Sequence, residues 1–228
     1  MSRRKIETLS YKLRPAESLH RSGVNSLAIS AGGLYSAGRD GVVRYWDTAA
    51  EQPQQISALD GHTDWVNAVI LAGKDAVISA SSDTTIVVWG SAARGHGRMA
   101  TLRCHTDYVK ALAYSEAAQT LVSSSLDQSI LLWDLATAVP LRRQHRSGEA
   151  DGDSPTLMDG PSESAYSIAM DYAGLLVASG STENNVHVWD TRAEQHAFTL
   201  HGHTDHVRSV LLNREGSVCV SGGSDVSA

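Results

Sequence analysis

The sequence predicts an all-β fold made of repeated four-stranded units. Three observations predict it: short apolar runs alternate with turns rich in Gly, Ser, Thr and Asp, segments that end in tryptophan recur at a regular spacing, and 42% of the 228 residues are hydrophobic. This hydrophobic fraction suffices for a sizeable core, so the chain is expected to be globular.

The repeat is clearest in four segments that end alike, GVVRYWD, TIVVWG, SILLWD and NVHVWD. Their tryptophans are 43, 44 and 56 residues apart, at Trp46, Trp89, Trp133 and Trp189. A period of about 40–45 residues with a terminal Trp-Asp resembles the blades of WD-repeat β-propellers. We therefore expect an incomplete propeller with four full blades and a partial fifth.

The repeat also sets the expected limits of the units. These are an N-terminal strand over 6–13, full blades over about 20–60, 62–103, 105–143 and 161–200, and a partial blade over 203–225. In the second blade, strands are expected at 66–71, 76–81, 85–89 and 98–102. Surplus residues at 144–160 are rich in Gly, Ser, Asp and Pro, which predicts an exposed inserted loop. Because the pattern stops in the fifth unit, we interpret the sequence as a fragment, a truncated gene model or a partial isoform; the alternative is a complete small protein that pairs its open edges with another chain.

A histidine, a serine and an acidic residue recur ahead of each tryptophan. On a blade, these groups are expected to form a buried hydrogen-bonded chain from the indole through the hydroxyl and the imidazole to the carboxylate. In the fourth unit, Pro161 takes the histidine position and Glu183 the acidic position, so this unit is degenerate. The predicted network comprises His20, Ser36, Asp40 and Trp46; His62, Ser79, Asp83 and Trp89; His105, Ser123, Asp127 and Trp133; Ser179 and Trp189; and His203, Ser221 and Asp225.

The same residues raise the question of catalysis, because His62, Ser79 and Asp83 are the residue types of a hydrolase triad. A triad positions one nucleophile against one base, so four or five copies favour a structural role. The sequence also lacks GxSxG, HExxH and CxxC motifs. We therefore expect no enzymatic activity and no cofactor. His201, His203 and His206 lack accompanying Cys or carboxylate ligands, so no metal site is predicted.

Charge and cysteine content narrow the class of protein further. The net charge of −6 argues against a nucleic-acid partner, because proteins that bind nucleic acid usually present a basic face. No apolar run approaches the roughly 20 residues of a membrane span. Cys104 and Cys219 have no metal-ligand spacing and are expected to be free, buried thiols in a reducing, intracellular compartment.

Several longer strings carry a more specific resemblance, from about residue 3 to 225: RRKIETLSYKLR, AGRDGVVRYWD, HTDWVNAV, ISASSDTTIVVW, HTDYVKALAY, GSTENNVHVWDTR and GHTDHVRSVLLNREG. Together they resemble the N-terminal half of the propeller in the family of WD repeat-containing protein 48, the USP-associated factor. That family has an eight-bladed propeller followed by an accessory region and ubiquitin-like folds, whereas this chain stops in the fifth blade. The resemblance implies a non-catalytic cofactor of the nucleus and cytoplasm that binds ubiquitin-specific proteases and raises their turnover.

Residues at the start of each inner strand are expected to point to the propeller rim, where they would contact a partner. They are Trp65, Asn67, Tyr108, Lys110, Ser164, Tyr166, His206 and Arg208. Aromatic and Arg side chains dominate the energetics of protein interfaces. The alternative is that Trp65 and Tyr108 pack against neighbouring blades. By resemblance, Arg208 takes the place of a basic residue that faces the protease.

A second functional hypothesis is a substrate receptor of a cullin-RING ubiquitin ligase. The residues Trp189, Asp190 and Arg192 match the WDxR pattern of propellers that dock on the adaptor of that ligase. The pattern arises easily by chance, because Trp-Asp is part of many blades.

Overall fold

The computed structural model describes residues 19–49, 54–140, 157–158, 164–193 and 195–225. Over these ranges the chain forms antiparallel sheets, and the helical structure consists of the 3-10 helix η2, Ala92–Arg94. The prediction of an all-β fold is confirmed. The strand expected over 6–13 lies outside the described residues.

In each full sheet the first four strands form a meander in which consecutive strands are neighbours. The first sheet contains β1 (Val24–Ser30), β2 (Gly33–Gly38), β3 (Val42–Asp47) and β4 (Gln54–Asp60). The second contains β5 (Val66–Ala72), β6 (Ala76–Ser81), β7 (Thr85–Gly90) and β8 (Arg98–Arg103). The third contains β9 (Val109–Ser115), β10 (Thr120–Ser125), β11 (Ile130–Asp134), β12 (Val139–Pro140) and β13 (Leu157–Met158). The fourth contains β14 (Ala165–Met170), β15 (Leu176–Ser181), β16 (Val186–Asp190) and β17 (Gln195–Leu200), and the fifth β18 (Val207–Leu212) and β19 (Cys219–Gly223).

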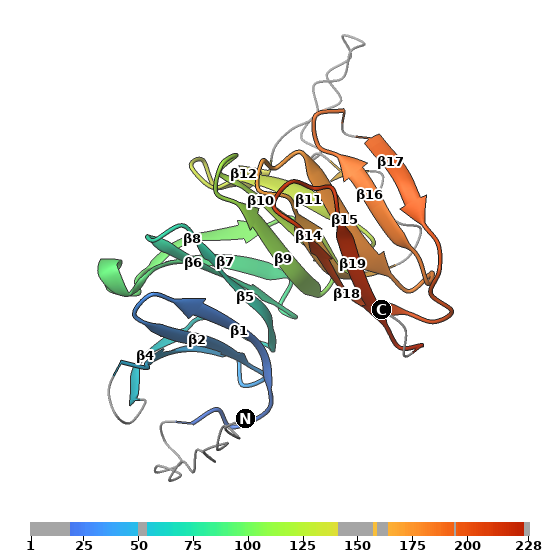
Figure 1. Ribbon diagram of the computed structural model, residues 1–228. Helices are drawn as coiled ribbons and strands as arrows, with labels where there is room; N and C mark the ends of the chain where they lie inside the picture. The colour runs from blue at the N-terminus through green and yellow to red at the C-terminus, as the bar shows by residue number, and fades with distance from the viewer. Residues whose placement is uncertain (1–18, 50–53, 141–156, 159–163, 194, 226–228) are drawn as a thin grey trace, which may run out of the picture.

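The five sheets follow one another in an arc, as Figure 1 shows from blue to red. The first strand of each sheet contacts the first strand of the next, in the order β1, β5, β9, β14 and β18. These are therefore the inner strands, and each sheet packs its faces against its neighbours. This is the arrangement of an incomplete β-propeller, as the sequence predicts.

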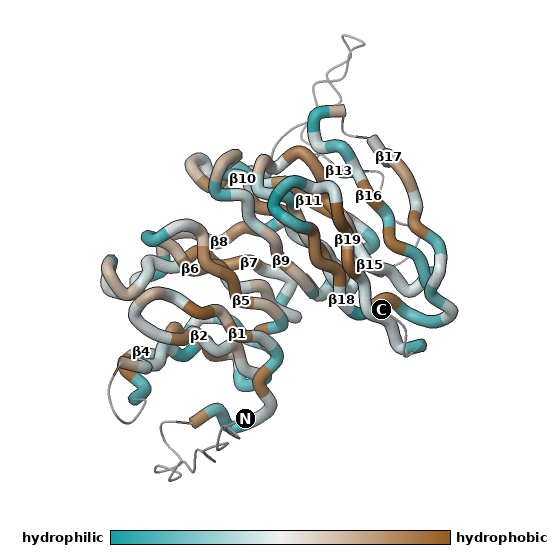
Figure 2. The backbone as a smooth tube through the Cα atoms, viewed as in Figure 1, coloured by the Kyte–Doolittle hydropathy of each residue, from teal (hydrophilic) through white to brown (hydrophobic). Residues whose placement is uncertain are grey.

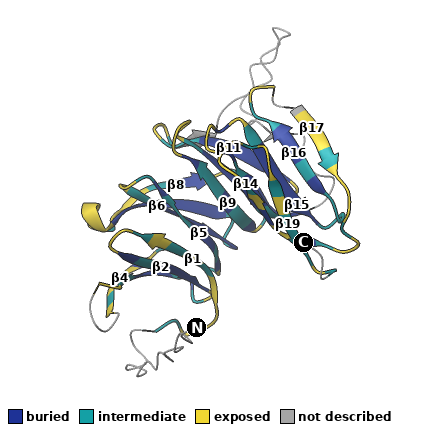
Figure 3. Cartoon of the chain, in the orientation of Figure 1, coloured by how far each residue is buried: buried dark blue, intermediate teal, exposed yellow. Residues whose placement is uncertain are grey.

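The hydrophobic core lies between successive sheets. Tyr35 and Leu59 of the first sheet pack in one cluster with Val69 and Trp89 of the second, and a further cluster joins the second sheet to Trp133 of the third. Figure 2 shows hydrophobic residues along the strands, and Figure 3 shows exposed residues on η2 and β17. Every residue of β7 is buried, because both faces of this strand are covered.

The outer strand of the third sheet is divided into two short pieces. β12 pairs with Trp133 and Asp134, whereas β13 pairs with Ile130 and Leu131 further along the same edge of β11. Residues 157–158 of the expected loop 144–160 thus join a sheet, and the other residues of that loop lie outside the described part of the chain. The pairing satisfies backbone groups on an edge that would otherwise be open.

Candidate protein-interaction surface

The second sheet contains a complete network of histidine, serine, aspartate and tryptophan. The indole N–H of Trp89 donates to Ser79 Oγ at 2.8 Å, and that hydroxyl lies 2.8 Å from His62 Nε2. His62 Nδ1 lies 2.9 Å from Asp83 Oδ2. The loop before β5 supplies the histidine, β6 the serine, the following turn the aspartate and β7 the tryptophan. The network therefore ties a loop and two strands of one sheet together.

The first and third sheets repeat this geometry. The histidine Nδ1 to carboxylate distance is 2.9 Å in both sheets, the histidine Nε2 to serine distance is 2.7 Å, and the indole to serine distance is 2.8 Å; the residues are His20, Ser36, Asp40 and Trp46, and His105, Ser123, Asp127 and Trp133. In the fifth sheet, His203 lies 3.0 Å from Asp225 and 2.9 Å from Ser221. Four copies of one arrangement are consistent with a structural role.

Three further residues join the networks, and the sequence analysis missed them. The hydroxyl of Thr85 donates to Asp83 at 2.6 Å and that of Ser129 to Asp127 at 2.5 Å. In the first sheet, Arg44 Nη1 donates to Asp40 at 2.8 Å instead. Two features of the sequence could have indicated these residues. One is a hydroxyl two residues after the aspartate, and the other is an arginine that interrupts the apolar run VVRYW.

In the first four sheets, the residue after the acidic residue has a left-handed backbone. Gly41 adopts φ 78° there, and the corresponding Thr84, Gln128 and Asn184 adopt 69°, 69° and 64°. Glycine takes this conformation without steric cost, whereas a β-branched threonine does not. The turn in the second sheet is therefore held against local strain, and the hydrogen bonds of Asp83 fix it in place.

The networks lower the pKa of their carboxyl groups. Burial alone raises the pKa of Asp40, but hydrogen bonds from His20, the Arg21 backbone and Arg44 outweigh it and lower the pKa to about 2. The same balance, with burial opposed by bonds from the histidine and a hydroxyl, holds the pKa of Asp83 and Asp127 well below the usual range. These aspartates therefore favour the folded state in their ionised form.

This balance predicts loss of stability in acid. Because the folded-state pKa of each aspartate lies below the ordinary value of 3.8, the stabilisation is complete above about pH 4 and is lost as the pH falls towards about 2 and below. The free energy of unfolding, measured with denaturant at a series of pH values, is expected to decline over this range. The Asp83→Asn variant should show a shallower decline; an equally steep decline would contradict the assignment.

The fourth sheet does not form the predicted chain. Ser179 Oγ is buried and has no hydrogen-bond partner among the described residues, so the indole of Trp189 does not donate to it. The prediction that Ser179 and Trp189 belong to one network is wrong. In sequence, Pro161 takes the position of the histidine and has no side-chain donor or acceptor, so the fourth unit supplies no imidazole to link Ser179 to the acidic residue.

The residues predicted to contact a partner lie at one end of the inner strands. Together with Arg39, they form what we call the rim surface: Arg39, Trp65, Asn67, Tyr108, Lys110, Ser164, Tyr166, His206 and Arg208. Trp65 is 48% exposed and Tyr108 45% exposed. The rings are thus not enclosed between neighbouring sheets. Large aromatic side chains left half in solvent on one rim are the kind of feature that marks interaction surfaces.

Arginine side chains hold two of the rim aromatics. The guanidinium of Arg39 lies 4.9 Å from the ring centre of Trp65, and that of Arg208 lies 5.1 Å from the ring centre of Tyr166. Both distances are within the range of cation–π contacts. Arg39 follows β2 and was not among the predicted contacts, because the sequence does not show that its side chain reaches the next sheet.

Two predicted contact residues instead join sheets to each other. The amide of Asn67 donates to the Val109 carbonyl at 2.9 Å and to Ser82 Oγ at 3.0 Å. His206 Nδ1 donates to the Thr182 carbonyl at 2.9 Å. Asn67 therefore ties the inner strands β5 and β9 together, whereas His206 ties the start of β18 to the turn after β15 and keeps part of its side chain exposed.

Five segments of the chain, 15–47, 53–90, 97–134, 153–190 and 194–225, match the family model described as WD domain, G-beta repeat. The chain belongs to the WD40 repeat family. WD40 domains mediate protein–protein interactions, and WD40 proteins are typically non-enzymatic scaffolds. The five repeats thus account for the recurring His, Ser, Asp and Trp positions and indicate an interaction role.

The WDxR residues of the fourth WD40 repeat differ widely in exposure. Trp189 is fully buried, whereas the side chain of Arg192 is 68% exposed and forms an ion pair with Asp190 at 2.7 Å. The ion pair and a backbone hydrogen bond from Arg192 lower the pKa of Asp190 to about 2. Only Asp190 and Arg192 are thus available to a partner from this motif.

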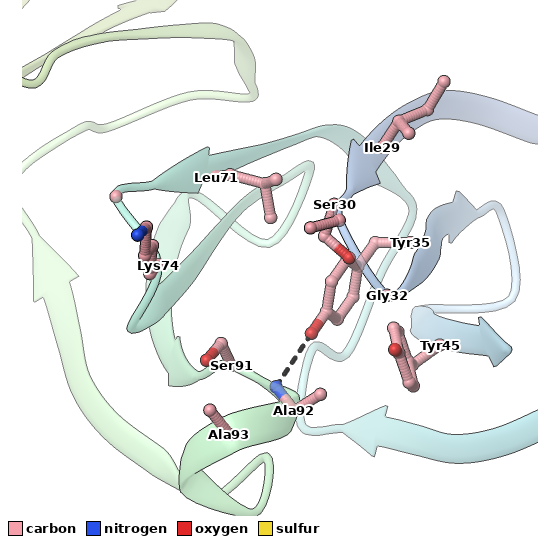
Figure 4. A pocket seen from close by; sticks show the side chains of 12 residues that line it. Ile29, Ser30, Gly32, Tyr35, Tyr45, Leu71, Lys74, Ser91, Ala92 and Ala93 are labelled. Carbon is pink, nitrogen blue, oxygen red and sulfur yellow. Dashed lines mark hydrogen bonds between the residues drawn. The ribbon is translucent and has the colours of Figure 1, made fainter. Parts of the chain in front are cut away.

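A cavity lies between the first two WD40 repeats, at the ends of the inner strands opposite the rim surface. It has a volume of about 420 Å³ and is lined by residues that include Tyr35, Tyr45, Leu71, Lys74 and Ser91. Figure 4 shows these side chains and the hydrogen bond that the Ala92 backbone N–H donates to the Tyr35 hydroxyl at 3.0 Å. The lining is mostly apolar.

The histidines considered for metal binding and the two cysteines form no further site in the described part of the chain. His201 is bonded to Asn185 at 2.8 Å, and within the described ranges no group of three His, Cys, Asp or Glu could hold a metal ion. Cys104 and Cys219 are partly buried free thiols, and burial raises the pKa of each. Over the same part of the chain, no helix has the length and apolar character needed to cross a bilayer.

Proposed function

We propose that this WD40 chain is a non-catalytic scaffold of the nucleus and cytoplasm whose rim surface binds a ubiquitin-specific protease and raises its turnover. The observation that carries the proposal is Trp65, a half-exposed ring held under Arg39 on an arc of aromatic and basic side chains. The resemblance of HTDWVNAV and HTDYVKALAY to the family of WD repeat-containing protein 48 supports this class of partner.

The rim surface has the composition of an interface hot spot. Trp, Tyr and Arg are the residues whose truncation most often costs binding energy. Arg39 and Arg208 rest on rings, which restricts their rotamers before a partner arrives. Binding then loses less side-chain entropy than it would with free arginines.

Activation in this proposal needs no chemistry from the scaffold. The His, Ser and Asp groups are engaged with one another below the surface, so the rim surface contributes binding energy alone. A scaffold raises the turnover of an enzyme when it binds the active conformation more tightly than the inactive one. The partner's own residues would perform the hydrolysis.

The Trp65→Ala variant tests the proposal. With a purified ubiquitin-specific protease catalytic domain and a fluorogenic ubiquitin substrate, the wild-type chain is expected to raise kcat. The variant should bind at least about 30-fold more weakly, which corresponds to a hot-spot loss of about 2 kcal/mol. Titration of the chain against protease activity measures both quantities.

The matched control is Tyr172→Ala. Like the rim aromatics, Tyr172 is half-exposed, at 45%, and the guanidinium of Arg214 lies 4.1 Å from its ring centre. Tyr172 lies in the turn after β14, away from the rim surface. It should leave stimulation unchanged. Equal losses in both variants, or no stimulation by the wild-type chain, would refute the proposal.

The second candidate is the ligase receptor, which the exposed Arg192 favours. A complex with the purified cullin-RING adaptor that is lost on Arg192→Ala would support it. Retained protease stimulation by the same variant, with no adaptor complex in the wild type, would support the first candidate.

A further inference from the structure

We infer that the cavity between Arg39, Trp65 and Lys110 binds a carboxylate side chain, so that the partner segment recognised by the rim surface is acidic. This inference rests on the proposed function only in taking the rim surface as the partner-binding face. The cavity has a volume of about 230 Å³ and is lined by Asn25, Arg39, Trp65, Asn67 and Lys110.

Two cations from different sheets, Arg39 and Lys110, line the cavity, and the positive charge of Arg208 also acts on Lys110. Arg39 reaches from the first sheet over Trp65, and Arg208 stacks on Tyr166 of the fourth sheet from the fifth. Lys110, on β9 of the third sheet, lies between them in the order of the inner strands. No ion pair joins any of the three to a carboxylate in the described part of the chain.

The positive charge of Lys110 is the least compensated of the three. Burial lowers the pKa of its ammonium group, and the positive charges of Arg39 and Arg208 lower it further. A partly buried ammonium group with like charges around it is destabilised in its charged form. An incoming carboxylate would remove that penalty, so the site favours an anion over a neutral group.

The donors of the cavity are already oriented. Arg39 Nε donates to Asn25 Oδ1 at 3.0 Å, and the Asn25 amide donates to the Val66 carbonyl at 3.0 Å. This leaves the terminal nitrogens of Arg39 and the ammonium of Lys110 for a ligand. The ring of Trp65 forms an apolar wall beside them, which suits the methylene groups of Glu or Asp.

A protein segment fits this surface better than nucleic acid. Asp64, Asp107 and Asp205 each precede a rim residue and accept the N–H of that residue, so carboxylates alternate with the rim side chains. The whole chain has a net charge of −6. A polynucleotide, with one negative charge per phosphate, would meet these carboxylates, whereas a peptide can place a single carboxylate in the cavity.

The test uses short fluorescein-labelled peptides that carry a single glutamate among neutral residues, with matched peptides in which glutamine replaces it. Fluorescence anisotropy should show binding of the glutamate peptides that weakens with salt. The Lys110→Gln variant is expected to weaken it at least about tenfold, and Arg39→Gln should act in the same direction. Arg39 is exposed, so its variant is expected to fold normally.

The charge-matched control is Lys74→Gln, since Lys74 is an exposed lysine in the turn between β5 and β6, at the other end of β5. It should leave peptide binding unchanged. Equal binding of glutamate and glutamine peptides, equal losses in Lys74→Gln and Lys110→Gln, or tighter binding of a single-stranded oligonucleotide that displaces the peptide would each overturn the inference.

The outcomes also separate this inference from the proposed function. Acidic peptides that bind through Lys110, with no stimulation of the protease, would refute the protease as partner and leave the acidic site standing. Protease stimulation that depends on Trp65, with glutamate and glutamine peptides bound alike, would refute the acidic site and leave the protease standing as partner.

Discussion

Replacing Trp133 with alanine is expected to lower the free energy of unfolding by about 3–5 kcal/mol, the usual cost of truncating a large buried aromatic side chain. Trp133 is 1% exposed and packs in the cluster between the second and third sheets. Its indole N–H also donates to Ser123 Oγ at 2.8 Å. The substitution thus creates a cavity and also removes one hydrogen-bond partner of the Ser123 hydroxyl.

Urea denaturation followed by far-UV circular dichroism measures this loss. Trp65→Ala is the internal control, because the same residue type is 48% exposed there and should change the unfolding free energy by only about 0.5 kcal/mol. If the two variants were equally destabilised, the assignment of Trp133 to the core and Trp65 to the rim surface would be wrong.

The second large effect is expected from Ser79→Ala, with a loss of about 2–4 kcal/mol. The change removes the partner of both Trp89 Nε1 and His62 Nε2, and a buried group without its partner costs about 1–3 kcal/mol. The residue at the same place in the fourth sheet behaves differently. Ser179→Ala removes a buried hydroxyl that has no partner within the described part of the chain, so stability should stay unchanged or rise by about 1 kcal/mol.

The two serine variants form a pair, because the residues share one strand position and both are fully buried. Thermal and urea unfolding of both give the comparison directly. A loss in Ser179→Ala as large as that in Ser79→Ala would mean that Ser179 has a partner after all, and that the fourth sheet is built like the second.

The regular parts of the molecule were predictable from the sequence because they are set by short-range rules. The residues of the second network occupy fixed places on consecutive strands, so the spacing of His62, Ser79, Asp83 and Trp89 indicates their contact. The four strands of that sheet lie within one or two residues of the expected positions. Repetition in other units made the pattern unambiguous.

The parts that were missed depend on contacts between units. The reach of Arg39 over Trp65 depends on how two sheets are placed. Ser179 recurs at the expected position, yet its hydroxyl has no partner in the described part of the chain. Arg44 looked like a break in an apolar run, although its guanidinium is bonded to Asp40. Periodicity within one unit carries no information about such distances.

The divided outer strand of the third sheet has a consequence for how this chain can lengthen. β12 and β13 each share an edge of β11 with no further strand beyond them in the described sheet, so the backbone leaves and rejoins the ladder without breaking an interior pairing. Because the entropic cost of closing a loop rises only slowly with its length, we expect this edge to tolerate grafted peptides or labels of different lengths.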